Sequence, residues 1–316
     1  MQEMRKRGQA PFSHGRDEAR WTASIDWDAF RGRTTFITGE DKNSGKTTFL
    51  KHAITSLRER ELALAYMSAG VDGEAFDLIS GAPKPVITAE EGDCIVTAES
   101  ALSASDAGFE VIRSFPDRTV LGSLALVRTT RRGLIELIGP ETNRALGEVL
   151  ESVRGLACAD AVLVDGAVDR VTQVGSSGGA GYVLALRVTP STLQRSARRA
   201  RLAVLLDGIP VLDGGAEEPG CFALEGALTA GKLGRIPVRC AGLALEDFTR
   251  VFLDYAGMAR LCREHPVFFR NRYALISVVV VLEGVEREEF LGALRGEADR
   301  APVYFSPYRL EPGQVS

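Results

Sequence analysis

The stretch TTFITGEDKNSGKTT, residues 34–48, decides the fold. Its first part is β-branched and apolar and ends at a glycine, which predicts a strand over residues 34–38. Apolar residues then recur at helical spacing, which predicts a helix from Lys46 to Arg60. A strand, a turn rich in small residues and a helix, followed by another apolar run over residues 62–67, are typical of the start of a parallel α/β sheet.

The turn between this strand and helix has the chemistry of a phosphate-binding loop. Its backbone N–H groups can wrap an anionic phosphate at the positive end of the helix. Lys46 can reach the β- and γ-phosphates, and the Thr47 hydroxyl can ligate Mg²⁺. We therefore expect ATP to bind here with Mg²⁺, through Gly39, Lys42, Asn43, Ser44, Gly45, Lys46, Thr47 and Thr48.

The spacing of this loop departs from the usual pattern. Five residues separate Gly39 from Gly45 where four are usual, and Glu40 stands where the first glycine would be. The alternative is a chance Gly-Lys-Thr on a surface turn. The apolar strand before the loop and the amphipathic helix after it favour nucleotide binding.

A second candidate lies at AVLVDG, residues 161–166, a near-continuous apolar run that predicts a buried parallel strand. Asp165 at its end can bind Mg²⁺ directly or through water, because this cation prefers oxygen ligands. The alternative is a turn or helix-capping acid. Asp72, after the second strand, is a further metal candidate or a solvated turn residue. Asp41 completes the predicted catalytic set with Lys46 and Asp165.

These motifs resemble those of a known family. Thr38-Gly39-x-Asp41-x-x-x-Gly45-Lys46-Thr47 looks like the phosphate loop of dethiobiotin synthetase, in the SIMIBI class of P-loop proteins, and residues 162–167 are similar to that family's strand near the metal. The resemblance implies a P-loop NTPase fold. That family carries a substrate-handling lysine at the end of its second strand, whereas this chain has Tyr66-Met67-Ser68 there.

The loop, the run VDGAVDR over residues 164–170 and the chain length also resemble a P-loop component that reactivates adenosylcobalamin-dependent lysine 5,6-aminomutase. This resemblance implies an accessory ATPase that acts on a client enzyme. The alternative is an ATP-dependent ligase of the dethiobiotin synthetase type, acting on a small carboxylate or amine. A third is an NTP-binding module that does not hydrolyse.

Composition limits the partners. The 316 residues carry a net charge of −4 with a pI near 5.6, which argues against a nucleic acid or an anionic membrane. Five scattered cysteines suit reduced thiols, and residues 1–20 lack the apolar segment of a signal peptide. We expect a soluble, cytoplasmic protein that forms a homodimer or a complex with a client. The most apolar run, residues 273–282, is half the length of a membrane span and predicts a buried strand.

The predicted fold is an α/β P-loop fold, with a mostly parallel sheet, helices on both faces and a smaller C-terminal or inserted α+β unit. Residues 1–30 form an N-terminal arm, 31–210 the nucleotide-binding domain, and 211–316 a C-terminal α/β extension that alternatively completes the same sheet. Within the extension, apolar periodicity predicts a helix over residues 245–261.

Overall fold

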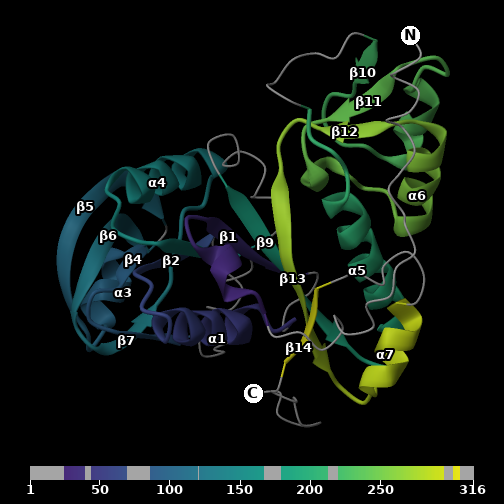
Figure 1. The fold of residues 1–316 in the computed structure, drawn as a ribbon. Coiled ribbons are helices and arrows are strands. Elements are labelled where there is room, and N and C mark those ends of the chain that lie inside the picture. Colours follow the sequence, from purple (N-terminus) through teal and green to yellow (C-terminus); the bar gives the residue numbers. More distant parts are fainter. Residues whose placement is uncertain are drawn as a thin grey trace.

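A computed structural model describes residues 25–39, 44–69, 86–119, 121–166, 179–212, 220–294 and 302–306. Its main feature is one nine-stranded sheet (Figure 1). In spatial order the strands are β14 (Val303–Phe305), β13 (Tyr273–Leu282), β9 (Ala180–Val188), β1 (Thr34–Gly39), β8 (Ala161–Gly166), β2 (Leu64–Ala69), β4 (Cys94–Ala98), β6 (Gly122–Arg131) and β5 (Gly108–Thr119). The strands from β14 to β4 run parallel, and β6 and β5 add an antiparallel ribbon at one edge. The chain is therefore an α/β protein built on a mostly parallel sheet.

Helices cover both faces of this sheet. Helix α1 (Lys46–Arg58) packs on β1, β8 and β2, while α4 (Asn143–Gly155) lies across the sheet from it (Figure 1). Helix α5 (Leu193–Asp207) packs on β9 and β13 and contacts α7 (Arg287–Leu294). Strands buried on both faces need apolar residues along their whole length, which explains the near-continuous apolar runs of β8, β9 and β13.

The connections create a switch point beside β1. From β1 the chain passes through α1 to β2, and β8 later fills the place between them. From β8 the chain crosses to β9, on the other side of β1. In open α/β sheets, ligands bind outside the carboxyl ends of the strands where the connections diverge in this way.

A second, smaller unit leaves the sheet after α5 and returns at β13. It is a parallel three-stranded sheet of β10 (Cys221–Ala223), β11 (Gly242–Leu245) and β12 (Val267–Phe269), with α6 (Tyr255–Glu264) and two short 3₁₀ helices, η6 (Ala230–Arg235) and η7 (Phe248–Arg250). It has its own hydrophobic cluster. Helix α5 serves both clusters, since Ala197 and Ala200 belong to the main core whereas Leu202 and Leu206 belong to the second.

The expected helix over residues 245–261 is wrong in its first half. Residues up to Leu245 form β11, and Asp247 caps the 3₁₀ helix η7 by accepting a hydrogen bond from the Thr249 N–H at 2.8 Å. The α-helix begins only at Tyr255, where Asp254 accepts from the Gly257 N–H at 2.8 Å. Short acidic side chains that bond to nearby backbone amides compete with helix propagation.

Four further elements complete the described chain: the antiparallel pair β3 (Val86–Ala89) and β7 (Gly133–Glu136), helix α3 (Glu99–Ala104), and the 3₁₀ helix η3 (Trp27–Phe30). Trp27 and Phe30 are buried, and the Trp27 ring stacks on Phe49 of α1 with centroids 6.3 Å apart. The rest of the predicted N-terminal arm, residues 1–24, lies outside the described residues. Among the helices of the described part, none combines the length and apolar character needed to cross a membrane.

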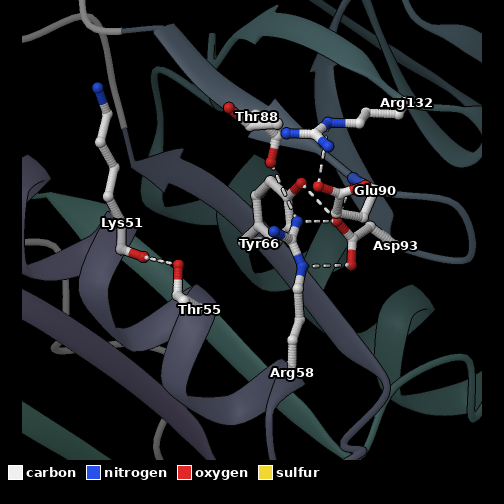
Figure 2. Close-up of polar contacts among 8 residues, drawn as sticks. All are labelled: Lys51, Thr55, Arg58, Tyr66, Thr88, Glu90, Asp93 and Arg132. Atoms are coloured by element: carbon white, nitrogen blue, oxygen red, sulfur yellow. Dashed lines mark hydrogen bonds and ion pairs between the residues drawn. The ribbon is translucent and has the colours of Figure 1, made fainter.

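A buried ion pair fixes the carboxyl end of α1 (Figure 2). Arg58 of α1 forms an ion pair with Asp93, just before β4, and also donates to the Thr88 carbonyl oxygen at 3.0 Å. The Tyr66 hydroxyl of β2 and the Glu90 N–H each donate to Asp93 Oδ2 at 2.9 Å. Burial raises the pKa of Tyr66, so its hydroxyl remains a donor. One carboxylate thus joins α1, β2, β3 and β4.

We expect Asp93→Asn to lower the free energy of unfolding by roughly 2–4 kcal/mol, because Arg58 loses its charge partner and one of the two accepting oxygens is replaced by an amide donor. Tyr66→Phe removes only one of these bonds and should cost about 1 kcal/mol. Denaturant unfolding of the two variants against the wild type measures both. Equal losses in the two variants would contradict the central role of the carboxylate.

Candidate functional site

The described ends of the loop after β1, Gly39 on one side and Ser44 and Gly45 on the other, pack tightly against their neighbours. Ser44 is buried, and its Oγ lies so near Gly39 that a Cβ there would come within 2.2 Å of it. Gly45 has φ +91°, in the left-handed region, and a Cβ would meet the Val281 side chain of β13 at 2.8 Å. Both glycines are therefore needed for the loop to pack against its neighbours.

Helix α1 begins at Lys46 with its amino end beside this loop. Gly45 supplies no side-chain cap, and the first turn contains no acidic residue. The Lys46 ammonium donates to Ser44 Oγ at 3.4 Å, which brings the lysine side chain back over the loop. The amino end of this 13-residue helix is thus positively polarised and carries a cation, as an anion site requires.

Thr47 and Asp165, 118 residues apart, are in direct contact. The Thr47 hydroxyl donates to Asp165 Oδ2 at 3.0 Å. The contact arises because β1 and β8 are parallel neighbours, with Ile37 paired to Asp165, so that the carboxyl end of β8 lies beside the first turn of α1. The structure therefore brings together the hydroxyl and the carboxylate that the sequence singles out as magnesium ligands.

The second carboxylate oxygen of Asp165 is an uncompensated acceptor. Asp165 Oδ1 is buried and has no hydrogen-bond partner among the described residues. Burial raises the pKa of Asp165 above its ordinary value, and the Thr47 hydrogen bond and the Lys46 charge only partly oppose this. A buried carboxylate oxygen without a partner is costly, and a bound cation is one group that would satisfy it.

The end of β2 forms the neighbouring wall, and here the structure adds residues that no sequence motif indicated. Ser68 is paired in register with Asp165, and its hydroxyl donates to the Leu137 carbonyl oxygen at 3.1 Å. Gly139 lies against the same strand, where a Cβ would come within 1.7 Å of the Ser68 carbonyl oxygen. The segment after β7 thus packs directly on the strand end beside Asp165, which local sequence patterns do not reveal.

A small hollow adjoins the loop on its other side. Its lining includes Gly45 and Thr48, together with Tyr304 and Ser306 from the far end of the chain. The Tyr304 hydroxyl lies 3.2 Å from His52 Nε2, and the two rings stack with centroids 5.7 Å apart. Burial lowers the pKa of His52, which favours a neutral ring at physiological pH. The pairing of β14 with β13 brings these C-terminal residues to the loop.

Four predicted site residues lie outside the described part of the chain: Asp41, Lys42, Asn43 and Asp72. Residues 167–170, the end of the run VDGAVDR, lie outside it too. Within the described ranges, no group of three or more His, Cys, Asp and Glu side chains is arranged to hold a metal ion. The described part of the candidate site therefore consists of one carboxylate, the hydroxyl that bonds to it, the lysine, and Gly39, Ser44 and Gly45 at the two ends of the loop.

A second small cavity lies at the amino ends of the strands of the large sheet. Tyr182, Asp207, Phe248 and Tyr273 are among its lining residues, and the Tyr182 and Phe248 rings stack at 4.3 Å. Burial raises the pKa of Asp207. Tyr182 and Tyr273 lie near the amino ends of their strands, so this cavity is separate from the loop at the carboxyl ends.

Comparisons of the chain with protein-family models, with curated proteins and with solved structures gave no match. A function must therefore be argued from the residues themselves. The described residues provide a helix amino end with a lysine, and next to it a hydroxyl bonded to a buried carboxylate at the carboxyl edge of a parallel sheet.

We expect Asp165→Asn to raise the free energy of unfolding of the ligand-free protein at neutral pH. The neutral amide can still accept from Thr47 but no longer buries an uncompensated charge. The pKa of Asp165 is about 4 in the unfolded chain and is higher in the folded protein. The wild type therefore loses stability as the pH rises from the first of these pKa values through the second. The gain should therefore be complete above this interval and vanish below about pH 4.

Denaturant unfolding at several pH values measures this difference. Thr47→Val is the matched comparison, because it keeps the charge and removes the donor, and should lower stability by about 1 kcal/mol. An Asp165→Asn variant that is less stable than the wild type at neutral pH would show that the carboxylate is well compensated without a ligand.

Proposed function

We propose that the protein binds ATP with Mg²⁺ at the carboxyl ends of β1 and β8 and hydrolyses it. One observation carries the proposal: the Thr47 hydroxyl bonds to Asp165 while the other carboxylate oxygen is buried without a described partner, next to the amino end of α1. A hydroxyl and a carboxylate at the end of a phosphate loop are the protein ligands that Mg²⁺ takes in P-loop proteins, with water and phosphate oxygens completing its octahedron.

Each group of the proposed site has a separate role. The amides of the loop and the first turn of α1 hold the phosphates, and Lys46 balances negative charge on the β- and γ-phosphates. Thr47 and Asp165 would hold Mg²⁺, which would offset negative charge on the phosphates. Asp41 orients the attacking water.

In this proposal the ATPase is an accessory factor that acts on a partner enzyme in the cytoplasm. The position at the end of β2 supports this role over small-molecule ligation. Ser68, in register with Asp165, occupies it and bonds back to the Leu137 carbonyl oxygen, so among the described residues β2 ends in a hydroxyl rather than an ammonium group for a carboxylate substrate. The resemblance of the loop and of residues 164–170 suggests an adenosylcobalamin-dependent aminomutase as the client.

We expect Lys46→Ala to weaken Mg·ATP binding roughly 10- to 100-fold, the effect of losing one charged hydrogen bond, and to abolish phosphate release. Lys51→Ala is the matched control, since Lys51 lies on the same helix, is exposed and extends away from the Arg58–Asp93 pair (Figure 2). Its binding and turnover should equal the wild type. Calorimetric titration and a phosphate-release assay measure both quantities. Wild-type protein that binds no nucleotide would refute the proposal.

The accessory role is tested separately. Basal hydrolysis should be slow and should rise severalfold on addition of the client aminomutase, with no dependence on a small carboxylate or amine. Turnover that requires such a small molecule and no protein would instead support the ligase. Steady-state phosphate release, with and without each addition, distinguishes the two.

A further inference from the structure

Two of the five cysteines meet at the amino edge of the large sheet. Cys94 is the first residue of β4 and is buried, whereas Cys158 lies in the turn between α4 and β8 and is partly exposed. The Cys94 thiol donates to the Cys158 carbonyl oxygen at 3.5 Å, and the two thiols also interact with each other. The residues are 64 apart in sequence, so this contact is created by the fold.

The backbone around both cysteines is anchored to one short segment. Cys94 is paired in register with Ala65 of β2. The turn that carries Cys158 is bonded to Ala63, two residues before Ala65. The Asp160 N–H donates to the Ala63 carbonyl oxygen at 2.7 Å, and Asp160 Oδ2 accepts from the Ala63 N–H at 2.9 Å. The two thiols are therefore held in contact by the main chain.

The two thiols differ in acidity. The hydrogen bond from Cys94 lowers the pKa of Cys158 to about 7, with help from a backbone hydrogen bond and the Arg128 charge, while burial opposes the shift. Arg128 is paired in register with Cys94 on β6. The same contact, together with burial, raises the pKa of Cys94. Cys158 is thus the more acidic and more exposed thiol of the pair, and Cys94 is the buried, protonated neighbour behind it.

We propose that Cys94 and Cys158 form an oxidative modification site, at which a peroxide converts the two thiols into a disulfide. In the first step the Cys158 thiolate attacks one peroxide oxygen, the O–O bond breaks, and Cys158 becomes a sulfenic acid as hydroxide leaves. In the second step the Cys94 sulfur attacks the Cys158 sulfur and the S–O bond breaks. The Cys94 proton leaves with the hydroxyl group as water. Two thiols are oxidised, and one peroxide is reduced.

This site is independent of the proposed nucleotide site, because it lies at the amino ends of the strands and the loop lies at their carboxyl ends. It also differs from the other three thiols. Cys221, Cys240 and Cys262 belong to the smaller unit, and Cys240 contacts His265 Nδ1 at 3.7 Å. These three cysteines provide internal references for reactivity in the same chain.

The test treats the reduced full-length protein with stoichiometric hydrogen peroxide and follows intact mass and mapped peptides. We expect a Cys94–Cys158 disulfide, seen as the loss of two hydrogen atoms, to form roughly tenfold faster than any modification of the other three cysteines. The preference should disappear in denaturant, because the fold creates the contact. A Cys221→Ser, Cys240→Ser, Cys262→Ser variant should behave as the wild type.

Single variants assign the two roles. In Cys94→Ser, Cys158 should stop at the sulfenic acid and be labelled by a dimedone probe. In Cys158→Ser, Cys94 should stay reduced. The proposal is overturned if Cys94 and Cys158 remain alkylatable while the other cysteines oxidise, or if Cys94 is labelled in Cys158→Ser. Circular dichroism of each variant establishes that it is folded. If a variant is unfolded, the comparison of wild-type protein with and without denaturant shows whether the fold creates the preference for the Cys94–Cys158 disulfide.

Discussion

The parallel pairing of β1 with a strand on each side is the constraint on which the rest of the molecule depends. On one side Ile37 is in register with Asp165 of β8, and on the other Gly39 is in register with Ala185 of β9. These pairings place the carboxyl ends of three buried strands at one edge, at the point where the chain changes direction. A shift of β8 by one residue would turn Asp165 to the opposite face of the sheet and separate it from Thr47.

Helix α1 is fixed at both of its ends. Its amino end packs against Val281 through Gly45 and contacts β8 through Thr47. Its carboxyl end is joined to β2 and β4 through Arg58 and Asp93. Charged and polar groups at the two ends therefore hold the helix in register with the sheet, and apolar burial along its length adds the bulk of the packing. An anion site needs its amides preorganised, and this double attachment provides that.

Local sequence signals predicted β1, β2, β8, α1 and the buried strand over residues 273–282, because their apolar patterns agree with their burial. The sequence also singled out Thr47 and Asp165, which the structure brings into contact, while their ligand roles remain predictions. It did not reveal that Ser306 reaches the loop or that Gly139 packs on Ser68, since both depend on pairings between distant segments. The helix expected from residue 245 failed because Asp247 bonds locally.

The sharing of α5 between two hydrophobic clusters has a consequence for motion. If the smaller unit swung away as a rigid lobe, Leu202 and Leu206 would be stripped of their apolar neighbours and exposed to water, which costs roughly 1.5–3 kcal/mol for each large side chain. Hinge opening is thus strongly opposed, and low-energy displacement must take the form of shear, with packed helices sliding by small amounts along one another. Stress applied to either unit is then carried along α5 into the other, so the two units respond mechanically as one.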